Sequence, residues 1–267
     1  MTIDVPGHSD PLRPGKLLCI GRNYAKHADE MGGDAPSEPM VFLKPSTALV
    51  RSGGAVVLPP QSEEVHHEVE LVAVIGAGGK HIAEEDALGH VAGYAAGLDM
   101  TARDLQRGAK ERRRPWSVAK GFDTFAPLGP VAPADEAPGV PDAAIRLSVN
   151  GEPRQDSRTQ HMIFSVAQLV AYCSTVFTLE AGDLLYTGTP EGVGPVEDGD
   201  RLEATLEGLP VLEVDVRRSG DRGRRRARSP RRSAPASRRS PGQTRRSIGP
   251  SSEDSSDRYL VVRSSFC

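Results

Sequence analysis

The feature that most limits how this chain can fold is a change of composition after Val216. Residues 217–267 contain fifteen Arg, no Lys and four acidic residues, and the first thirty of them have almost no apolar side chains. Such a segment cannot bury enough apolar surface to offset the entropy lost on ordering, so we expect it to be disordered. The foldable part is therefore predicted to be residues 16–216, preceded by a short N-terminal segment, residues 1–15.

Strand patterns outnumber helical patterns within residues 16–216. Apolar or β-branched runs predict strands at 17–21, 40–45, 66–76 and 92–100, and Asn150-Gly151 predicts a hairpin turn. Polar helix formers or helical spacing predict short helices after Asn23 with Asn23 as N-cap, over 101–114 with Thr101 as N-cap, and over 165–177 with Ser165 as N-cap. The predicted fold class is α+β, mainly β, with a few short helices.

Two acidic residues interrupt the most apolar of these strands. Glu68 and Glu70 are two positions apart, so they point to the same face at a separation of about 7 Å. They repel each other unless they are solvated, one is protonated, or a cation lies between them. A cation with carboxylate ligands would be Mg²⁺ or Mn²⁺. A solvated strand face is the commoner arrangement for two Glu at this spacing, and spacing leaves His66 and Asp99 open as a third ligand.

His27 and Glu30 are three positions apart in a predicted helix and share one of its faces. A carboxylate beside an imidazole fixes its tautomer and raises its basicity, which suits a general base near neutral pH. A surface pair without a catalytic role has the same spacing. The pattern by itself does not choose between the two.

Seven segments, taken together and in this order, resemble the fumarylacetoacetate hydrolase family. They are GRNYAKHADEM, EPMVFLKPSTALV, HHEVELVAVIG, GLDMTARDLQ, PWSVAKGFD, NGEPRQ with MIFS, and LLYTGTPEGVGPV. They cover residues 16–216, and the chain is similar to the short branch that includes acylpyruvate hydrolases and oxaloacetate decarboxylases. The resemblance implies a mixed β-roll fold and a homodimer. The tail from Arg217 is not part of the family pattern, and the stretch RGAKERRR after TARDLQ is unusually basic without touching the motif residues.

The resemblance also implies roles for nine residues. The metal ligands for Mg²⁺ or Mn²⁺ are Glu68, Glu70 and Asp99, the catalytic residues are His27, Glu30 and Lys120, and the substrate-binding residues are Arg103, Gln106 and Thr189. No phosphate-loop pattern is present, so we expect no nucleotide cofactor.

These roles suggest a reaction. The carboxylate and keto oxygens of a 2,4-dioxo acid, of acylpyruvate or fumarylpyruvate type, would bind the metal while His27 takes a proton from the attacking water. Cleavage of the carbon–carbon bond would leave a pyruvate enolate, stabilised by the metal and Lys120. Loss of CO₂ from oxaloacetate gives the same enolate, so decarboxylation is a further expected activity. Isomerisation of a 2-hydroxy-dienedioate in aromatic degradation is the alternative.

Other features bear on the cellular setting. No apolar run is long enough for a transmembrane helix, and residues 1–15 lack the basic and apolar regions of a secretory signal. The three cysteines are widely spaced and odd in number, which indicates a reducing compartment. We therefore expect a cytoplasmic protein that acts on a small molecule and does not associate with membranes.

The Arg-rich tail raises a different class of function. Fifteen Arg would attract nucleic-acid phosphates without sequence specificity. No recognition fold accompanies them, however, and Arg-, Ser- and Pro-rich sequence without Lys resembles GC-rich coding DNA read out of frame. We therefore expect no nucleic-acid binding and interpret residues 217–267 as a non-native or lineage-specific extension.

Overall fold

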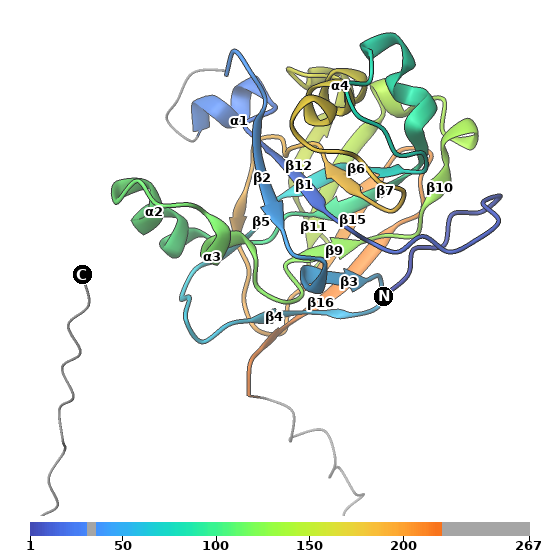
Figure 1. Cartoon of the computed structure of the whole chain (residues 1–267). Helices are drawn as coiled ribbons and strands as arrows, with labels where there is room; N and C mark the ends of the chain where they lie inside the picture. The colour runs from blue at the N-terminus through green and yellow to red at the C-terminus, as the bar shows by residue number, and fades with distance from the viewer. Residues whose placement is uncertain (31–35, 221–267) are drawn as a thin grey trace, which may run out of the picture. The chain divides into compact units, whose positions relative to one another are not determined.

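The computed structural model describes residues 1–30 and 36–220, and within them the fold is mainly β with a few short helices, as the sequence predicts (Figure 1). In spatial order, the eight-stranded sheet consists of β2 (Met40–Lys44), β1 (Leu17–Gly21), β13 (Leu184–Tyr186), β6 (Val69–Ile75), β7 (Val91–Leu98), β9 (Ala126–Leu128) and β3 (Leu49–Arg51), with β10 (Ala132–Pro133) paired to β7. The five-stranded sheet consists of β12 (Glu152–Arg158), β11 (Ala144–Val149), β15 (Arg201–Leu206), β16 (Leu212–Arg218) and β4 (Ala55–Leu58). The three-stranded sheet consists of β14 (Gly194–Pro195), β5 (Val65–His67) and β8 (Thr101–Ala102).

Short helices connect the strands. The α-helices of the described residues are α1 (Ala25–Glu30), α2 (Arg103–Glu111), α3 (Ser117–Lys120) and α4 (Val166–Val176). The 3₁₀ turns are η1 (Ser46–Ala48), η2 (Glu84–His90), η3 (Ala134–Glu136), η4 (Val140–Asp142) and η5 (Thr159–His161). Figure 1 shows α2 and α3 projecting from one side of the sheets, where α2 packs on α3 and α3 lies against β2 and β8. This position brings both helices beside the end of β6.

Strand β6 separates two hydrophobic cores. Its side chains alternate between them: Val69, Leu71, Ala73 and Ile75 belong to the larger core, and Val72 and Val74 belong to the smaller one. All seven residues of β6 are buried. The period-2 alternation predicted from the sequence is therefore confirmed, but both faces of the strand are dry, so a charged residue on either face needs a specific partner.

The single strand predicted over 66–76 is in fact two strands, β5 and β6, which belong to different sheets. Glu68 lies between them and is part of neither. The chain leaves the ladder with β7 beyond the pair Val69–Leu98 and pairs with β8 and β14 instead. Of the two candidate third ligands, Asp99 lies with Glu68 and Glu70, whereas the His66 Nε2 lies 2.8 Å from the Glu64 carboxylate.

Two local predictions are confirmed. The hairpin between β11 and β12 turns at Asn150 and Gly151, which both have positive φ (54° and 81°), as a two-residue type I′ turn requires. Helix α4 begins after Ser165, whose Oγ accepts the Gln168 N–H at 3.2 Å, and the Gln168 side chain accepts the Ser165 N–H at 2.9 Å. This reciprocal arrangement is a capping box.

The other two predicted helix caps are wrong. Helix α2 has Ala102 at its N-cap, while the Thr101 hydroxyl donates to the Asp99 carbonyl at 3.1 Å. Asn23 precedes α1, but its Nδ2 donates to the carbonyls of Phe164 (3.0 Å) and Thr187 (2.8 Å). The Thr101 side chain thus makes a local contact two residues away, whereas the Asn23 side chain makes contacts with residues far away in the chain.

The described structure extends past the expected limits of the globular part. Near the N-terminus, Ile3 and Leu12 form a backbone bridge and are buried in the smaller core. At the other end, Arg217 and Arg218 are the last residues of β16 and pair with β4, so they are not part of a disordered tail. The rest of the predicted disorder, residues 221–267, lies outside the described residues.

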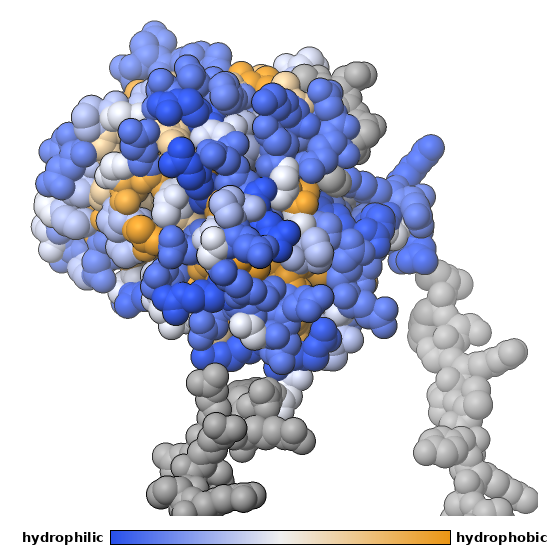
Figure 2. Space-filling view, turned by 180° about the vertical axis from the view of Figure 1, so that it is seen from behind, coloured by the Kyte–Doolittle hydropathy of each residue, from blue (hydrophilic) through white to orange (hydrophobic). Residues whose placement is uncertain are grey.

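Polar residues cover most of the face seen in Figure 2, and hydrophobic residues form separate patches on it. The large hydrophobic residues exposed in the described part of the chain come from different elements: Met1, Leu43, Val57, Leu88, Val118, Val176 and Val211. In the same residues, no helix is long and apolar enough to cross a membrane.

Candidate active site

Three carboxylates meet where β6 begins and β7 ends. Glu70 is in β6 opposite Gly97 of β7, and Asp99 directly follows β7. The Asp99 N–H donates to the Glu68 carbonyl at 2.8 Å, which continues the ladder by one step past β6. The side chains of Glu68, Glu70 and Asp99 are all buried, and one oxygen from each lies within 4.8 Å of the other two.

The three carboxylates do not have equivalent surroundings. Burial opposes ionisation of Glu68, but the charges of Lys120 and Arg103 outweigh it and hold the pKa of Glu68 below its ordinary value. Burial raises the pKa of Glu70 well above its ordinary value, and repulsion from Asp99 and Glu68 adds to the increase. No described cation forms an ion pair with Glu70; its Oε2 accepts only the Gly188 N–H, at 2.8 Å.

Gly188 can approach Glu70 in this way because it is a glycine. Its φ is +97°, and a Cβ at this position would lie 2.7 Å from the Cβ of Asn23. Both facts exclude an ordinary side chain. The turn after β13 therefore fixes one oxygen of Glu70 through its backbone.

A divalent cation fits this group of residues. Three buried carboxylates offer the hard oxygen ligands that Mg²⁺ and Mn²⁺ prefer, and Glu70 lacks a positive charge beside it. Among the residues that the structure describes, no other group of His, Cys, Asp or Glu has such a geometry. Glu68, Glu70 and Asp99, which the sequence predicted as ligands, are thus the residues that could hold the ion.

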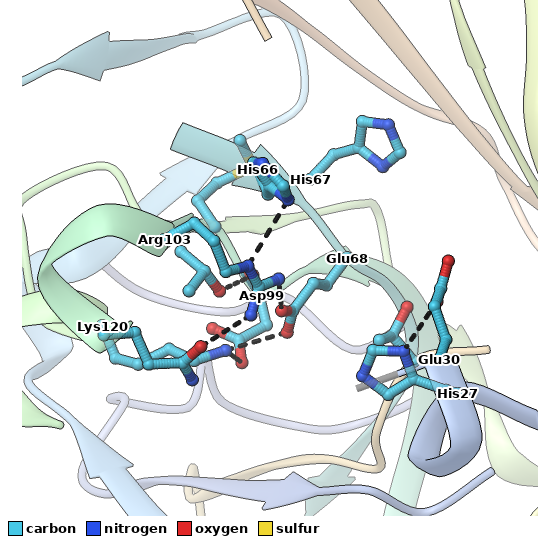
Figure 3. Close-up of polar contacts among 12 residues, drawn as sticks. His27, Glu30, His66, His67, Glu68, Asp99, Arg103 and Lys120 are labelled. Atoms are coloured by element: carbon cyan, nitrogen blue, oxygen red, sulfur yellow. Dashed lines mark hydrogen bonds and ion pairs between the residues drawn. The ribbon is translucent and has the colours of Figure 1, made fainter. Parts of the chain in front are cut away.

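Two helices carry cations to the same place (Figure 3). Lys120, the last residue of α3, lies 2.8 Å from Glu68 Oε2 and also pairs with Asp99. Burial opposes its charge, but Asp99 and Glu68 outweigh burial and raise the pKa of Lys120. Arg103, the first residue of α2, pairs with Glu68 and donates to the side-chain oxygen of Gln106 at 2.7 Å.

His27 and Glu30 approach from α1. The His27 ring is buried, and its Nδ1 lies 3.3 Å from the Glu30 carboxylate. Glu30 is partly exposed and also accepts the Gly192 N–H at 3.3 Å. In Figure 3 the His27 ring lies on the side of the site away from Lys120 and Arg103.

Thr189 is held at the site by Gln155. The Gln155 Nε2 donates to the Thr189 hydroxyl at 2.9 Å, while its Oε1 accepts the N–H of Val69 at 3.0 Å and lies 3.0 Å from His67 Nδ1. Burial lowers the pKa of His67 to about 4, so its ring is neutral near pH 7. Gln155 therefore joins β12, β6 and the turn after β13 around one buried amide.

These side chains surround a small cavity of about 30 Å³. Eight of the nine residues singled out from the sequence line it: His27, Glu68, Glu70, Asp99, Arg103, Gln106, Lys120 and Thr189. Glu30 lies behind His27 and does not line the cavity. The structure thus brings all nine together, eight at the cavity and one through its contact with His27.

Sequence reasoning missed Lys44, a buried lysine at the end of β2. It forms an ion pair with Asp99 and donates to the Met100 carbonyl at 3.0 Å. A signal was present, because a lysine in an apolar strand just before Pro45 breaks the apolar pattern. Neighbouring Leu43 is exposed, so β2 presents its charged residue to the interior and its apolar residue to solvent.

Arg22 and Lys110 were also missed. Both line the cavity, together with Phe42 and Trp116. Lys110 belongs to the basic stretch after TARDLQ, which the sequence analysis placed away from the motif residues. That expectation is wrong, because α2 turns Lys110 toward the same cavity as Arg103.

Comparison with known proteins gives the same picture. Residues 16–217 match the family described as fumarylacetoacetate (FAA) hydrolase C-terminal. The chain is 45% identical, over 203 residues, to the mitochondrial oxaloacetate tautomerase of Arabidopsis thaliana; the match covers 76% of this chain and 91% of that protein.

Solved structures agree with this match. A fumarylpyruvate hydrolase from Pseudomonas aeruginosa, in complex with Mn²⁺ and pyruvate, is 46% identical with a TM-score of 0.76, covering 81% of this chain and 95% of that one. A 5-carboxymethyl-2-hydroxymuconate delta-isomerase from Mycobacterium smegmatis is 45% identical with a TM-score of 0.71, covering 79% and 81%. The fold and the sequence pattern are therefore shared by enzymes named for three different activities: a tautomerase, a hydrolase and an isomerase.

Proposed function

The chain belongs to the fumarylacetoacetate hydrolase family, and on this basis we propose that it hydrolyses a carbon–carbon bond in a 2,4-dioxo acid with the help of a divalent metal ion. The observation that carries the proposal is a base and three carboxylates on one cavity: His27 lines it together with Glu68, Glu70 and Asp99. The fumarylpyruvate hydrolase of Pseudomonas aeruginosa, with its Mn²⁺ and pyruvate, supports both the metal and the pyruvate fragment.

Arg103 is suited to bind the substrate carboxylate. Three of its five N–H groups donate to Glu68, Gln106 and His66. The remaining two N–H groups belong to the same guanidinium, and the three hydrogen bonds hold this guanidinium in place. A carboxylate at this position would receive a pre-oriented donor without the cost of ordering a long side chain.

His27 is suited to move the proton. Because its Nδ1 faces Glu30, the tautomer with a proton on Nδ1 leaves Nε2 free to accept one. His27 would take a proton from a water molecule, and the resulting hydroxide would attack the distal carbonyl of the substrate. Glu30 would stabilise the protonated ring. The imidazolium could then return the proton to the carbon that leaves as an enolate.

Lys120 is suited to stabilise the charge that develops. Its raised pKa keeps it an ammonium, and it lies at the carboxylates where the pyruvate end of the substrate would sit. A divalent ion held by Glu68, Glu70 and Asp99 would supply further positive charge to the carboxylate and keto oxygens. The bond that breaks lies between C3 and C4 of the dioxo acid, and its electrons pass into the enolate of pyruvate.

Oxaloacetate is the second candidate substrate. The oxaloacetate tautomerase of Arabidopsis thaliana supports it, and tautomerisation requires only that a base such as His27 move a proton at the carbon next to the keto group. Decarboxylation of oxaloacetate gives the same enolate as hydrolysis. The isomerase from Mycobacterium smegmatis supports proton transfer along a dienol in the same way.

A substrate panel tests these candidates. The purified protein is treated with a chelator, reloaded with Mn²⁺ or Mg²⁺, and mixed with fumarylpyruvate, acetylpyruvate or oxaloacetate; released pyruvate, the cleaved acid and CO₂ are measured. We expect metal-dependent release of pyruvate and the cleaved acid in equal amounts from a dioxo acid. Turnover of oxaloacetate alone would replace hydrolysis by the second candidate, and metal-independent turnover would contradict the metal role.

A further inference from the structure

Arg22 and Lys110 line the cavity without an acidic partner among the residues that the structure describes. The Arg22 Nε is buried and makes no hydrogen bond within that part of the chain. Arg103 and Lys120, in contrast, both form ion pairs with Glu68. Arg22 and Lys110 are therefore cations on the cavity that form no ion pair within the described residues, although the charge of Glu68 still acts on Lys110.

The two unmatched cations repel each other. Burial lowers the pKa of Lys110, and repulsion from Arg22 is the next cause, ahead of Arg103. Arg22 also has a φ of 59°, a conformation that costs energy for a residue with a side chain. Keeping two like charges together at a half-buried position is unfavourable unless an anion joins them.

An aromatic pair lies between Lys110 and Lys120. Lys120 Nζ lies 4.9 Å from the centre of the Phe42 ring, and Lys110 Nζ lies 5.4 Å from the Trp116 ring. The two rings meet edge to face, with their centres 5.8 Å apart. The two rings thus form an apolar surface between Lys120 and Lys110.

We propose that Arg22 and Lys110 bind a second carboxylate at the far end of the substrate, so that the site selects dianionic dioxo acids over acylpyruvates with an uncharged acyl group. The proposal rests on the proposed function for the identity of the reacting end. The second anion accounts for three observations together: the buried Nε of Arg22, the repulsion between the two cations, and the apolar wall between them and Lys120.

Binding measurements test the proposal without turnover. Calorimetry on the Mn²⁺-loaded protein compares 2-oxoadipate with 2-oxohexanoate, which have the same chain length and differ in the terminal carboxylate. We expect the protein to prefer the diacid. Arg22→Gln and Lys110→Gln should each weaken diacid binding by roughly ten- to hundredfold, the value of a hydrogen bond to a charged group, and change monoacid binding little.

Arg114→Gln is the matched control, since it removes one charge from the same basic stretch at an exposed position outside the cavity. It should keep the wild-type preference. If Arg22→Gln does not fold, Lys110→Gln still gives the answer. Equal binding of both acids by the wild type, binding of neither, or equal weakening of both by the variants would overturn the proposal.

Kinetics separates this proposal from the proposed function. If the diacid preference is found but no dioxo acid is cleaved, the carboxylate site stands and the hydrolase function falls. If fumarylpyruvate and acetylpyruvate are cleaved with equal kcat/KM, and Arg22→Gln affects neither, the hydrolase function stands and the carboxylate site falls.

Discussion

The surroundings of Glu70 indicate that its carboxylate needs a positive charge beside it. It is buried, it lies near Glu68 and Asp99, and its only hydrogen-bond donor among the described residues is the Gly188 N–H. These surroundings favour the protonated carboxyl, whereas a metal ion requires the carboxylate. Metal binding and proton release at Glu70 should therefore be coupled.

This coupling predicts a pH dependence. The pKa of Glu70 in the metal-free fold lies well above 4.5, so a proton must leave before the ion binds. Affinity for Mn²⁺ should therefore rise with pH above 4.5, by up to tenfold per pH unit for as long as Glu70 is protonated in the metal-free protein. Calorimetry in two buffers of different ionisation enthalpy measures the released proton. A pH-independent affinity would contradict the coupling.

The raised pKa of Glu70 also affects the stability of the fold. Because the folded pKa of Glu70 exceeds the unfolded value, its contribution favours the fold fully below pH 4.5 and is lost as the pH rises through the raised pKa. This contribution should vanish in Glu70→Gln. The difference in Tm between wild type and variant, both metal-free, should therefore change with pH in this direction.

Replacing single carboxylates separates metal binding from fold stability. Glu68→Gln and Glu70→Gln should both lose Mn²⁺ binding and reduce activity by more than about a hundredfold. Only Glu68→Gln should also lower Tm strongly, because it leaves Lys120 and Arg103 without their shared partner, at a cost of roughly 3–5 kcal/mol. Calorimetry for metal and a thermal melt of the metal-free protein measure both effects. Normal turnover by either variant would refute the metal assignment.

His27 provides the corresponding test of the base. His27→Ala should lose about a hundred- to ten-thousandfold in kcat, the range for a general base, while affinity for Mn²⁺ stays near that of the wild type. In the described structure, the His27 ring forms no hydrogen bond with the carboxylates of Glu68, Glu70 and Asp99; its partner is Glu30. Lys26→Ala, an exposed change in the same helix, is the control. Full activity of His27→Ala would remove its role in activating water.

At the scale of elements, predictions from the sequence succeeded where the deciding interactions are local. The Asn150-Gly151 turn needs only two residues that accept positive φ, and α4 needs only a side chain that caps its first turn. The predicted cap of helix α2 was wrong because a residue far away in the chain stabilises the start of this helix. The Arg103 N–H donates to the Glu64 carbonyl at 2.7 Å. That bond replaces the cap expected from Thr101.

The capping box of α4 leads to a prediction about stability alone. Ser165→Ala removes the oxygen that accepts the Gln168 N–H, and should cost about 1 kcal/mol and lower Tm by a few degrees. The activity should not change, because α4 contributes no residue to the cavity. Ser165→Thr keeps the oxygen and should recover most of the loss. A Tm equal to that of the wild type in Ser165→Ala would show that the box contributes nothing.

At the scale of the whole molecule, the boundaries of the folded part matter. Strand β16 includes Arg217 and Arg218, and the Ser219 N–H donates to the Leu58 carbonyl at 3.1 Å. The Arg-rich sequence thus begins inside the five-stranded sheet. A deletion that starts at 218 would remove a paired residue, whereas one that starts at 221 would not.

Truncation after Gly220 should therefore leave both Tm and activity unchanged, while truncation after Val216 should lower Tm because it removes the last pairs between β16 and β4. Thermal melts and pyruvate release measure the outcome. RNA binding that is salt-sensitive in the full chain and absent after truncation would instead assign the tail a separate function. The homodimer implied by the family stays a prediction, which light scattering on both forms can test.

The features that could be predicted without coordinates are those that depend on neighbours along the chain. They include the strand periodicity of residues 69–75, the hairpin at Asn150, the cap at Ser165 and the pairing of His27 with Glu30 by i, i+3 spacing. The family pattern added Asp99 and Lys120, which no spacing rule connects to Glu68. The predictions from neighbouring residues succeeded because short-range geometry limits where such side chains can point.

Which distant charges share a cavity depends on long-range packing and could not be predicted from local patterns. The break between β5 and β6 places Glu68 between these two strands and beside the end of β7. Long-range packing brings Lys44 to Asp99 and Lys110 near Arg22. No local pattern encodes these contacts, because each depends on how sheets and helices far apart in the chain pack together. Their charges act through a dry interior, where a few ångströms decide whether a carboxylate holds a proton or an ion.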